Sequence, residues 1–104
     1  RSLDAIRYIE NHIDESPTNS DLAKIANMAT NSFSRLFKEK MSMTLHTFIM
    51  KRKIAQACEL FLHTNKSIKE VAFTTGFSDR YHFSRVFKSV TGTTPAVYKS
   101  GKFS

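Results

Sequence analysis

The strongest constraint on this chain is a hexapeptide that occurs twice. Residues 33–38 read Phe-Ser-Arg-Leu-Phe-Lys, and residues 83–88 read Phe-Ser-Arg-Val-Phe-Lys, fifty positions later. On a helix, this spacing puts the three apolar side chains on one side and Ser, Arg and Lys on the other. Two such cationic surfaces suit a partner that itself repeats, and duplex DNA is a regularly repeating polyanion. The repeat therefore predicts a duplicated DNA-binding device.

The duplication extends beyond the hexapeptide. At separations of 49 or 50 residues, the matched pairs are Leu22 with Val71, Ala23 with Ala72, Asn27 with Gly76, Thr44 with Thr94, and Phe48 with Tyr98. Each copy reads as a short helix, a tight turn with a residue that tolerates left-handed geometry, and a longer helix. This order is the helix-turn-helix plan.

Helical periodicity runs through almost the whole chain, and the alternation typical of strands is absent. We therefore predict an all-α fold of seven helices, in which two helix-turn-helix units are joined by a long central helix. We expect one domain over residues 1–104, with unit one at about 18–41, the linker helix at about 44–63, unit two at about 67–90, and the last helix at about 94–99.

Residue type and spacing also predict how these helices begin and what they bury. Capping boxes are expected at Thr18 with Asp21 and at Ser67 with Glu70, and single caps at Thr44, Ser78 and Thr94. Ala29 stands in the place that we assign to Ser78, so the first copy lacks a cap. The predicted core includes Leu3, Ile6, Ile9, Ile13, Leu22, Ala23, Ile25, Ala26, Phe33, Leu36, Phe37, Phe83, Val86, Phe87 and Val90.

The net charge of +7 is unevenly distributed. Residues 1–21 carry a net charge of −3, and residues 22–104 carry +10. This asymmetry indicates a polyanionic partner for everything after the first helix. No apolar run is long enough to span a membrane, so we expect no membrane contact by this segment. A single cysteine, Cys58, is expected to be a buried thiol in a reducing cytoplasm.

No sequence pattern supports catalysis, a metal site or a cofactor. The four histidines, His12, His46, His63 and His82, have no partner at a spacing of three or four residues and no cysteine cluster nearby. A nucleophile–base pair, a glycine-rich phosphate loop and a close pair of carboxylates are also missing. We expect neither an enzyme nor a cofactor-binding protein.

The candidate DNA-binding residues are the outward positions of the second helix in each unit. In a helix-turn-helix, this helix lies in the major groove, where Arg can pair with guanine and Asn with adenine. The predicted base-reading residues are Thr30, Asn31, Ser34, Arg35, Arg80, Tyr81, Ser84 and Arg85. The predicted phosphate contacts are Lys38, Thr44, His82, Lys88, Thr94 and Lys99.

Some of these residues have a structural alternative. Arg35 and Arg85 could pair with nearby acidic residues such as Glu39 and Asp79, and Tyr81 could pack against its own scaffold. The recurrence of Arg in matched settings favours the DNA reading. A linker helix of about 20 residues would span about 30 Å, close to the 34 Å between successive major grooves. One chain could therefore place its two reading helices in adjacent grooves.

From about Asp21 to Lys99 the chain resembles the DNA-binding domain of the AraC/XylS family of bacterial transcription regulators. The resemblance rests on Gly-Phe-Ser at 76–78, Tyr-x-Phe-Ser-Arg-x-Phe-Lys at 81–88 and Gly-x-Thr-Pro-x-x-Tyr at 92–98. It implies two helix-turn-helix units on a long helix, binding to promoter DNA, and usually activation. It also implies an effector-binding or phosphorylation-controlled domain upstream. Lys53 and Lys99 stand where the family often has Arg.

The leading hypothesis is a cytoplasmic, sequence-specific, double-stranded DNA-binding module that regulates a bacterial promoter, with activation as the expected direction. RNA polymerase is the expected protein partner, and the fragment is expected to be a monomer, with dimerisation of the full-length protein left open. A chain that begins at Arg1 is expected to be part of a longer protein. Two alternatives remain: the targeting domain of a DNA-repair protein, and a protein-docking module that uses the acidic first helix.

Overall fold

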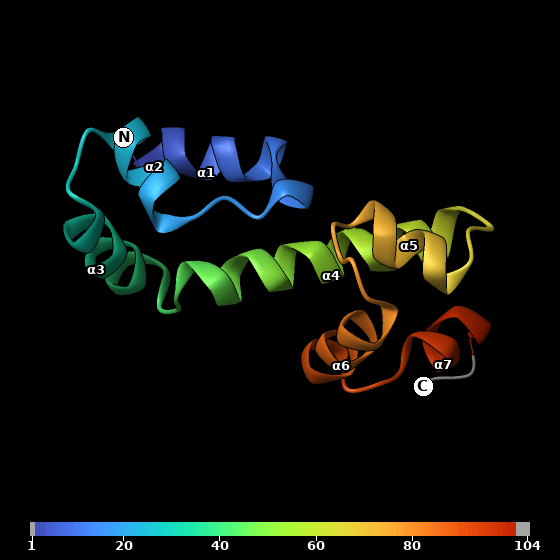
Figure 1. The fold of residues 1–104 in the computed structure, drawn as a ribbon. Coiled ribbons are helices and arrows are strands. Elements are labelled where there is room, and N and C mark those ends of the chain that lie inside the picture. Colours follow the sequence, from blue (N-terminus) through green and yellow to red (C-terminus); the bar gives the residue numbers. More distant parts are fainter. Residues whose placement is uncertain (1, 102–104) are drawn as a thin grey trace. The chain divides into compact units, whose positions relative to one another are not determined.

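The computed structural model describes residues 2–101, and side chains from residue 4 onward. Within this range the chain is helical and has no strand (Figure 1). The helices are α1 (Ser2–Asn11), α2 (Asn19–Ala26), α3 (Thr30–Met41), α4 (Leu45–His63), α5 (Ile68–Thr74), α6 (Arg80–Thr91) and α7 (Pro95–Ser100), with a short 3₁₀ segment at Ile13–Glu15. The predicted all-α fold, with two helix-turn-helix units and a long helix between them, is confirmed.

The helices form two compact units, Arg1–Met50 and Lys51–Ser104. The first unit contains α1, α2, α3 and the start of α4, and the second contains the rest of α4 with α5, α6 and α7 (Figure 1). The helix-turn-helix pair is α2 with α3 in the first unit and α5 with α6 in the second.

The core of the first unit lies between α1, α2, α3 and the first turns of α4. Its buried members are Ala5, Ile9, Leu22, Ala23, Phe33, Phe37, Leu45, Phe48 and Ile49. Phe33 and Phe37 are one helical turn apart on α3, so both rings face the same side. Burying each ring stabilises the unit by about 2–3 kcal/mol. This burial leaves the opposite side of α3 for solvent or a partner.

The second unit has the same plan with more aromatic rings. Phe83 and Phe87 on α6 are both completely buried. The ring of Phe61 on α4 lies 6.3 Å from that of Phe83 and 5.8 Å from that of Phe87. The ring of Phe77, in the turn before α6, lies 5.3 Å from Phe83. These contacts fix the orientation of α6 about its own axis.

The three-dimensional packing repeats with the sequence. Phe37 meets Phe48 edge to face at 5.5 Å, and Phe87 meets Tyr98 edge to face at 5.4 Å. Because Phe48 and Tyr98 are a pair predicted from the spacing, the same contact is made twice by matched residues. The alignment of the two copies is therefore confirmed in the packing of each unit.

The turns inside the two helix-turn-helix pairs also match. The amide of Met28 donates to the carbonyl of Ala23, and the amide of Phe77 donates to that of Ala72, both at 2.9 Å. Asn27 has φ 59° and Gly76 has φ 93°, so each turn contains the left-handed residue that was predicted. In the second unit α5 ends at Thr74, two residues before Gly76.

Both predicted capping boxes are present. The Thr18 amide donates to the Asp21 carboxylate at 3.0 Å, and the Ser67 amide donates to the Glu70 carboxylate at 2.8 Å. These hydrogen bonds hold the pKa of Asp21 and of Glu70 below their ordinary values. A lowered pKa means that the caps stabilise the fold above the pKa of the unfolded chain. Their contribution is lost as the pH falls through the folded pKa.

The predicted cap at Ser78 is wrong. The cap of α6 is Asp79, whose side chain accepts a hydrogen bond from the Tyr81 amide at 2.8 Å. A carboxylate with backbone extended at that residue captures the second amide of the helix, so Ser78 is one position too early. The counterpart of Asp79 fifty residues earlier is Ala29, which begins α3 with no side-chain hydrogen bond. As predicted, the first copy therefore has no side-chain cap at the start of α3.

The end of α3 also differs from the end of α6. Gly92 follows α6 with φ 85°, and Ser42 follows α3 with φ 62°. Each donates its amide to the carbonyl four residues earlier, Lys88 or Lys38. Ser42 therefore has left-handed geometry that costs a residue with a Cβ more than it costs glycine. Ser42 is therefore a point of mild backbone strain.

Several predicted core residues are not buried. Ile25 is 40% exposed and Val90 is 39% exposed, because each lies on the edge of its helix rather than at the packed centre. Ile13 follows the end of α1 in the 3₁₀ segment and is half-buried, and Cys58 is also half-buried. The side chain of Leu3 lies outside the described residues.

A contact within the second unit explains the position of Cys58. The phenol of Tyr98 is hydrogen-bonded with the Cys58 thiol, and this contact, followed by burial, raises the pKa of Tyr98. Among the described helices, none has the length and apolar character needed to cross a membrane.

The unequal caps give a stability prediction. The substitution Ala29→Asp should raise the free energy of unfolding by about 0.5–1 kcal/mol, because it supplies α3 with the cap that Asp79 gives α6. Urea unfolding followed by circular dichroism would measure the change. Asp79→Ala is the matched control and should destabilise by a similar amount. An unchanged midpoint for Ala29→Asp would contradict the assignment.

Candidate nucleic-acid interface

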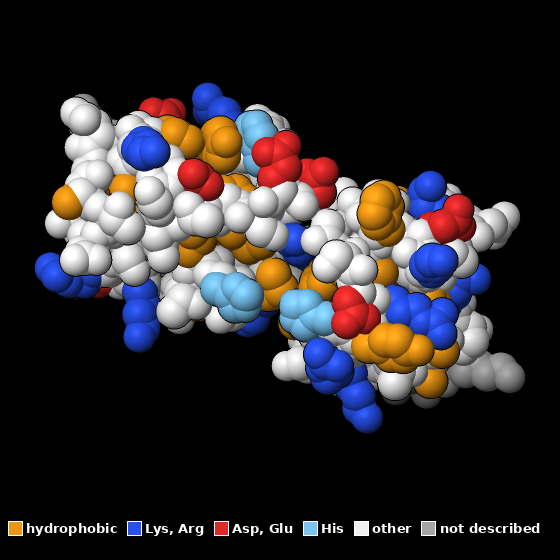
Figure 2. Space-filling model, viewed as in Figure 1, with side chains coloured by type: hydrophobic (Ala, Val, Ile, Leu, Met, Phe, Trp, Pro, Cys, Tyr) orange, Lys and Arg blue, Asp and Glu red, His pale blue; other side chains and the backbone are white. Residues whose placement is uncertain are grey.

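The outer surface of α3 carries the residues predicted to contact DNA in the first unit. With Phe33 and Phe37 buried, the opposite side of the helix is open. The residues of α3 that were predicted to contact DNA, Thr30, Asn31, Ser34, Arg35 and Lys38, are all exposed. Their backbone is rigidly helical, so the buried rings determine the direction in which these side chains project. In Figure 2, Lys and Arg side chains project from the surface over α3.

The outer surface of α6 is the equivalent in the second unit. The exposed residues are Arg80, Tyr81, His82, Arg85 and Lys88, while Ser84 is half-buried. Tyr81 is 66% exposed, so it does not pack into its own scaffold. The Arg80 guanidinium lies 5.5 Å from the centre of the Tyr81 ring, a cation–π contact. This pair presents an aromatic group and a cation side by side at the start of α6.

A shallow hollow gathers four of the predicted residues of the second unit. Ser84, Arg85 and Lys88 from α6 line it together with Thr94, which caps α7. Ser89 also lines the hollow and was missed by the sequence analysis. Its position four residues after Arg85 on the same helix was the available signal. Two cations beside three hydroxyls form a surface that can bind a phosphate group.

The described residues do not form the ion pairs that the sequence left open as an alternative role for the two arginines. Among the residues that the structure describes, no ion pair joins Arg35 to Glu39 or Arg85 to Asp79. Asp79 is used as the cap of α6 instead. Both guanidinium groups are therefore exposed on the outer side of their helices.

The remaining predicted phosphate residues lie at helix ends. Thr44 accepts a hydrogen bond from the Thr47 amide at 3.2 Å, and Thr94 accepts one from the Val97 amide at the same distance. Both hydroxyls are therefore caps. The ring of His82 packs edge to face on Phe77 at 5.4 Å while the residue stays exposed. Lys99 is exposed in the last turn of α7.

Lys53 is a supporting residue that sequence reasoning did not identify. It is 1% exposed, so it cannot reach DNA. Its ammonium donates to the carbonyl of Gly76 at 3.3 Å and lies 5.1 Å from the centre of the Phe77 ring. Lys53 therefore holds the turn between α5 and α6 from beneath. The sequence could not predict this burial, because it depends on how the turn between α5 and α6 packs against α4.

Among the described residues, no group of three or more histidine, cysteine or acidic side chains could hold a metal ion. The His63 ring lies 3.3 Å from the Glu59 carboxylate on the exposed side of α4. Neither residue belongs to the predicted DNA-binding residues. The outer surfaces of α3 and α6 carry cationic and hydroxyl side chains together with the Tyr81 ring. Side chains of these kinds can bind anions.

A family model described as a helix-turn-helix domain matches residues 22–101. The chain belongs to the AraC/XylS family. This match begins inside α2 and includes all of α3, the second helix-turn-helix pair and the hollow at α6 and α7. The chain is thus an AraC-type DNA-binding domain, and this assignment supports transcription regulation through DNA binding.

The curated relatives of this AraC-type domain include transcription regulators. The arabinose operon regulatory protein of Escherichia coli (strain K12) is 32% identical over an alignment of 104 residues, which covers 97% of this chain and 35% of the relative. The chain spans about a third of the length of this relative and of two other curated regulators that it matches.

Solved structures of AraC-type domains have the same fold. The C-terminal domain of AraT, a response regulator from Geobacillus stearothermophilus, superposes with a TM-score of 0.86 at 28% identity, covering 93% of this chain and 81% of that chain. The DNA-binding domain of the transcriptional factor AdpA, solved in complex with a target DNA, gives a TM-score of 0.88 at 23% identity, covering 95% and 89%. The similarity to the AdpA domain supports the all-α fold of this chain.

The role of Lys53 gives a second stability prediction. Lys53→Ala should lower the free energy of unfolding by about 2–4 kcal/mol, because it leaves a cavity and a Gly76 carbonyl without its donor. Lys53→Met should recover part of the loss, since its side chain can fill the space of the lysine stem. Urea denaturation would measure both.

The matched control is Lys51→Ala on the exposed side of α4, which should change the stability by less than about 0.5 kcal/mol. If Lys53→Ala were as mild as Lys51→Ala, the supporting role of Lys53 would be wrong.

Proposed function

We propose that this domain binds double-stranded DNA sequence-specifically, with α3 and α6 in adjacent major grooves, and thereby regulates transcription from a bacterial promoter. The observation that carries the proposal is the duplicated outer surface of these two helices. Ser34, Arg35 and Lys38 on α3 recur as Ser84, Arg85 and Lys88 on α6. Buried phenylalanines on the inner side support both sets.

The proposed roles follow from side-chain chemistry and from position on each helix. Residues near the start of a helix in the major groove are placed to reach base edges, and residues further along meet the backbone. The proposed base-reading residues are Thr30, Asn31, Ser34, Arg35, Arg80, Tyr81, Ser84 and Arg85. The proposed phosphate contacts are Lys38, Thr44, His82, Lys88, Thr94 and Lys99, to which the hollow at α6 adds Ser89.

The two units have different residues at the positions that would select the DNA sequence. Thr30 and Asn31 begin α3, whereas Arg80 and Tyr81 begin α6. Asn suits adenine, Arg suits guanine, and an aromatic ring can contact the thymine methyl group. The proposed binding site is therefore asymmetric, with a different half-element for each unit.

The length of α4 supports the use of adjacent grooves. Its 19 residues span about 28 Å at about 1.5 Å per residue. Successive major grooves on one side of B-DNA are about 34 Å apart, so modest DNA bending would bring the two half-elements into reach. We propose that this fragment binds as a monomer, because it already contains two reading helices.

We propose that the parent protein acts in the cytoplasm and activates transcription through contact with RNA polymerase. The acidic end of α1 and the 3₁₀ segment support a protein contact, since Asp14 and Glu15 would be repelled by DNA. In Figure 2, Asp and Glu side chains gather at this end of α1. A sensing or receiver domain upstream is supported by the greater length of the curated relatives.

A selection from random duplexes followed by protection mapping would test the two-groove model. We expect two half-elements about 10–11 base pairs apart, each protected in the major groove, with one protein chain bound per site. The spacing follows from the pitch of B-DNA and the length of α4. Protection limited to one groove segment, or two chains bound per site, would contradict the two-groove model.

Substitutions on α6 would separate base reading from phosphate contact. Arg85→Ala should cost about 1–3 kcal/mol on the selected site and less on random DNA, because it removes a contact to a base edge. Lys88→Ala should weaken both DNAs equally and reduce the slope of affinity against salt by about one ion. Binding titrations at several salt concentrations would measure both effects. Equal losses on the two DNAs for Arg85→Ala would contradict its base-reading role.

A further inference from the structure

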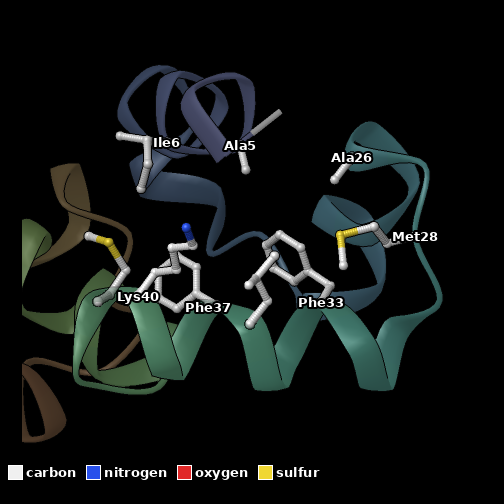
Figure 3. A pocket seen from close by; sticks show the side chains of 9 residues that line it. Ala5, Ile6, Ala26, Met28, Phe33, Phe37 and Lys40 are labelled. Atoms are coloured by element: carbon white, nitrogen blue, oxygen red, sulfur yellow. The ribbon is translucent and has the colours of Figure 1, made fainter.

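An apolar cavity of about 170 Å³ lies within the first unit between α1, α2 and α3. Its walls include Ala5 and Ile6 from α1, Ala26 from the end of α2, and Phe33 and Phe37 from α3. Figure 3 shows the rings of Phe33 and Phe37 rising from α3 toward Ala5 and Ile6. A dry apolar cavity of about 150 Å³ is large enough to hold benzene, so this space can accept a small organic molecule.

The cavity exists because small side chains face the phenylalanines of α3. Ala5 and Ala26 end at Cβ, and neither fills the space above the rings. In the second unit the matching phenylalanines, Phe83 and Phe87, are covered by the ring of Phe61 and are completely buried. The Phe61 ring therefore contacts both phenylalanines in the second unit, whereas Ala5 and Ala26 leave a space beside those of the first unit.

One wall of the cavity carries a cation. Lys40 on α3 lines the space, and Figure 3 shows its nitrogen between Ile6 and the ring of Phe37. The residue as a whole is exposed, so the ammonium group stands at the mouth of an otherwise apolar space. The position fifty residues later is Val90, which carries no charge. An apolar body with one negative group would match both the walls and the lysine.

We propose that this cavity is a binding site for small apolar carboxylates, molecules with a short hydrocarbon body and one carboxylate. The hydrocarbon part contacts Ala5, Ala26 and the two phenylalanines, and the carboxylate pairs with Lys40. Filling the space removes apolar surface from water, and the partly exposed ion pair gives a modest preference for the acid over a neutral molecule of equal shape. The site is separate from the outer surface of α3, so it does not depend on the proposed DNA binding.

Hexanoate is a suitable probe, and hexanamide is its neutral counterpart of nearly equal shape. Titration of the 104-residue chain, followed by ¹H–¹³C methyl spectra, should show saturable shifts at Ala5, Ile6, Ala26 and Met28. Hexanoate should bind about three- to fivefold more tightly than hexanamide, the size expected for one partly exposed ion pair. Methyl shifts confined to the second unit, or no saturable shift, would overturn the site.

Two variants separate the charge from the cavity. Lys40→Met should reduce hexanoate affinity to that of hexanamide, whereas Lys24→Met, an exposed lysine on α2, should leave both affinities unchanged. Ala26→Leu should fill the space and lower both affinities at least about fivefold. A retained methyl spectrum would show that the variant is folded. If Lys40→Met and wild type bound hexanoate equally, the assignment to carboxylates would be wrong.

Discussion

The fold depends on the burial of two phenylalanines on the inner side of α3 and two on the inner side of α6. Phe33 and Phe37 in one unit, and Phe83 and Phe87 in the other, are spaced by one helical turn. Their burial fixes the rotation of α3 and α6 about their axes, because both rings must leave water at once. The polar residues of the hexapeptide then have only the outer side to occupy. The polar outer surface of these helices is therefore a consequence of the core.

The two units share this plan but support it differently. The second unit holds α6 with the Asp79 cap, the left-handed Gly92 and the buried Lys53 beneath its turn. The first unit has Ala29 at the cap and Ser42 in left-handed geometry, and a cavity lies under α3. Each difference weakens the support of α3 relative to that of α6. The proposed reading helices are thus alike in surface chemistry and unequal in stability.

Most of the fold was predictable because its signals are local. The capping boxes at Thr18 and Ser67 need only residues three apart, and the bounds of α4 follow from the Thr44 cap and the turn after His63. The Ser78 prediction was wrong because two good caps stand next to each other, and only the backbone at Asp79 decides between them. Ile25 and Val90 were wrongly placed in the core. Periodicity predicts which side of a helix packs against its neighbours, but it does not show where on that side the packing ends.

The sequence alone determined the helices, the duplication and which residues of each hexapeptide face outward, since these depend on spacing within one or two helical turns. The tertiary structure alone decided what residues distant in sequence do together. It buried Lys53 against a carbonyl 23 residues away, brought Thr94 beside Ser84 and Arg85, and left the space between α1 and α3. Such contacts depend on how whole helices pack, and a helical period carries no information about the neighbour that a side chain will meet.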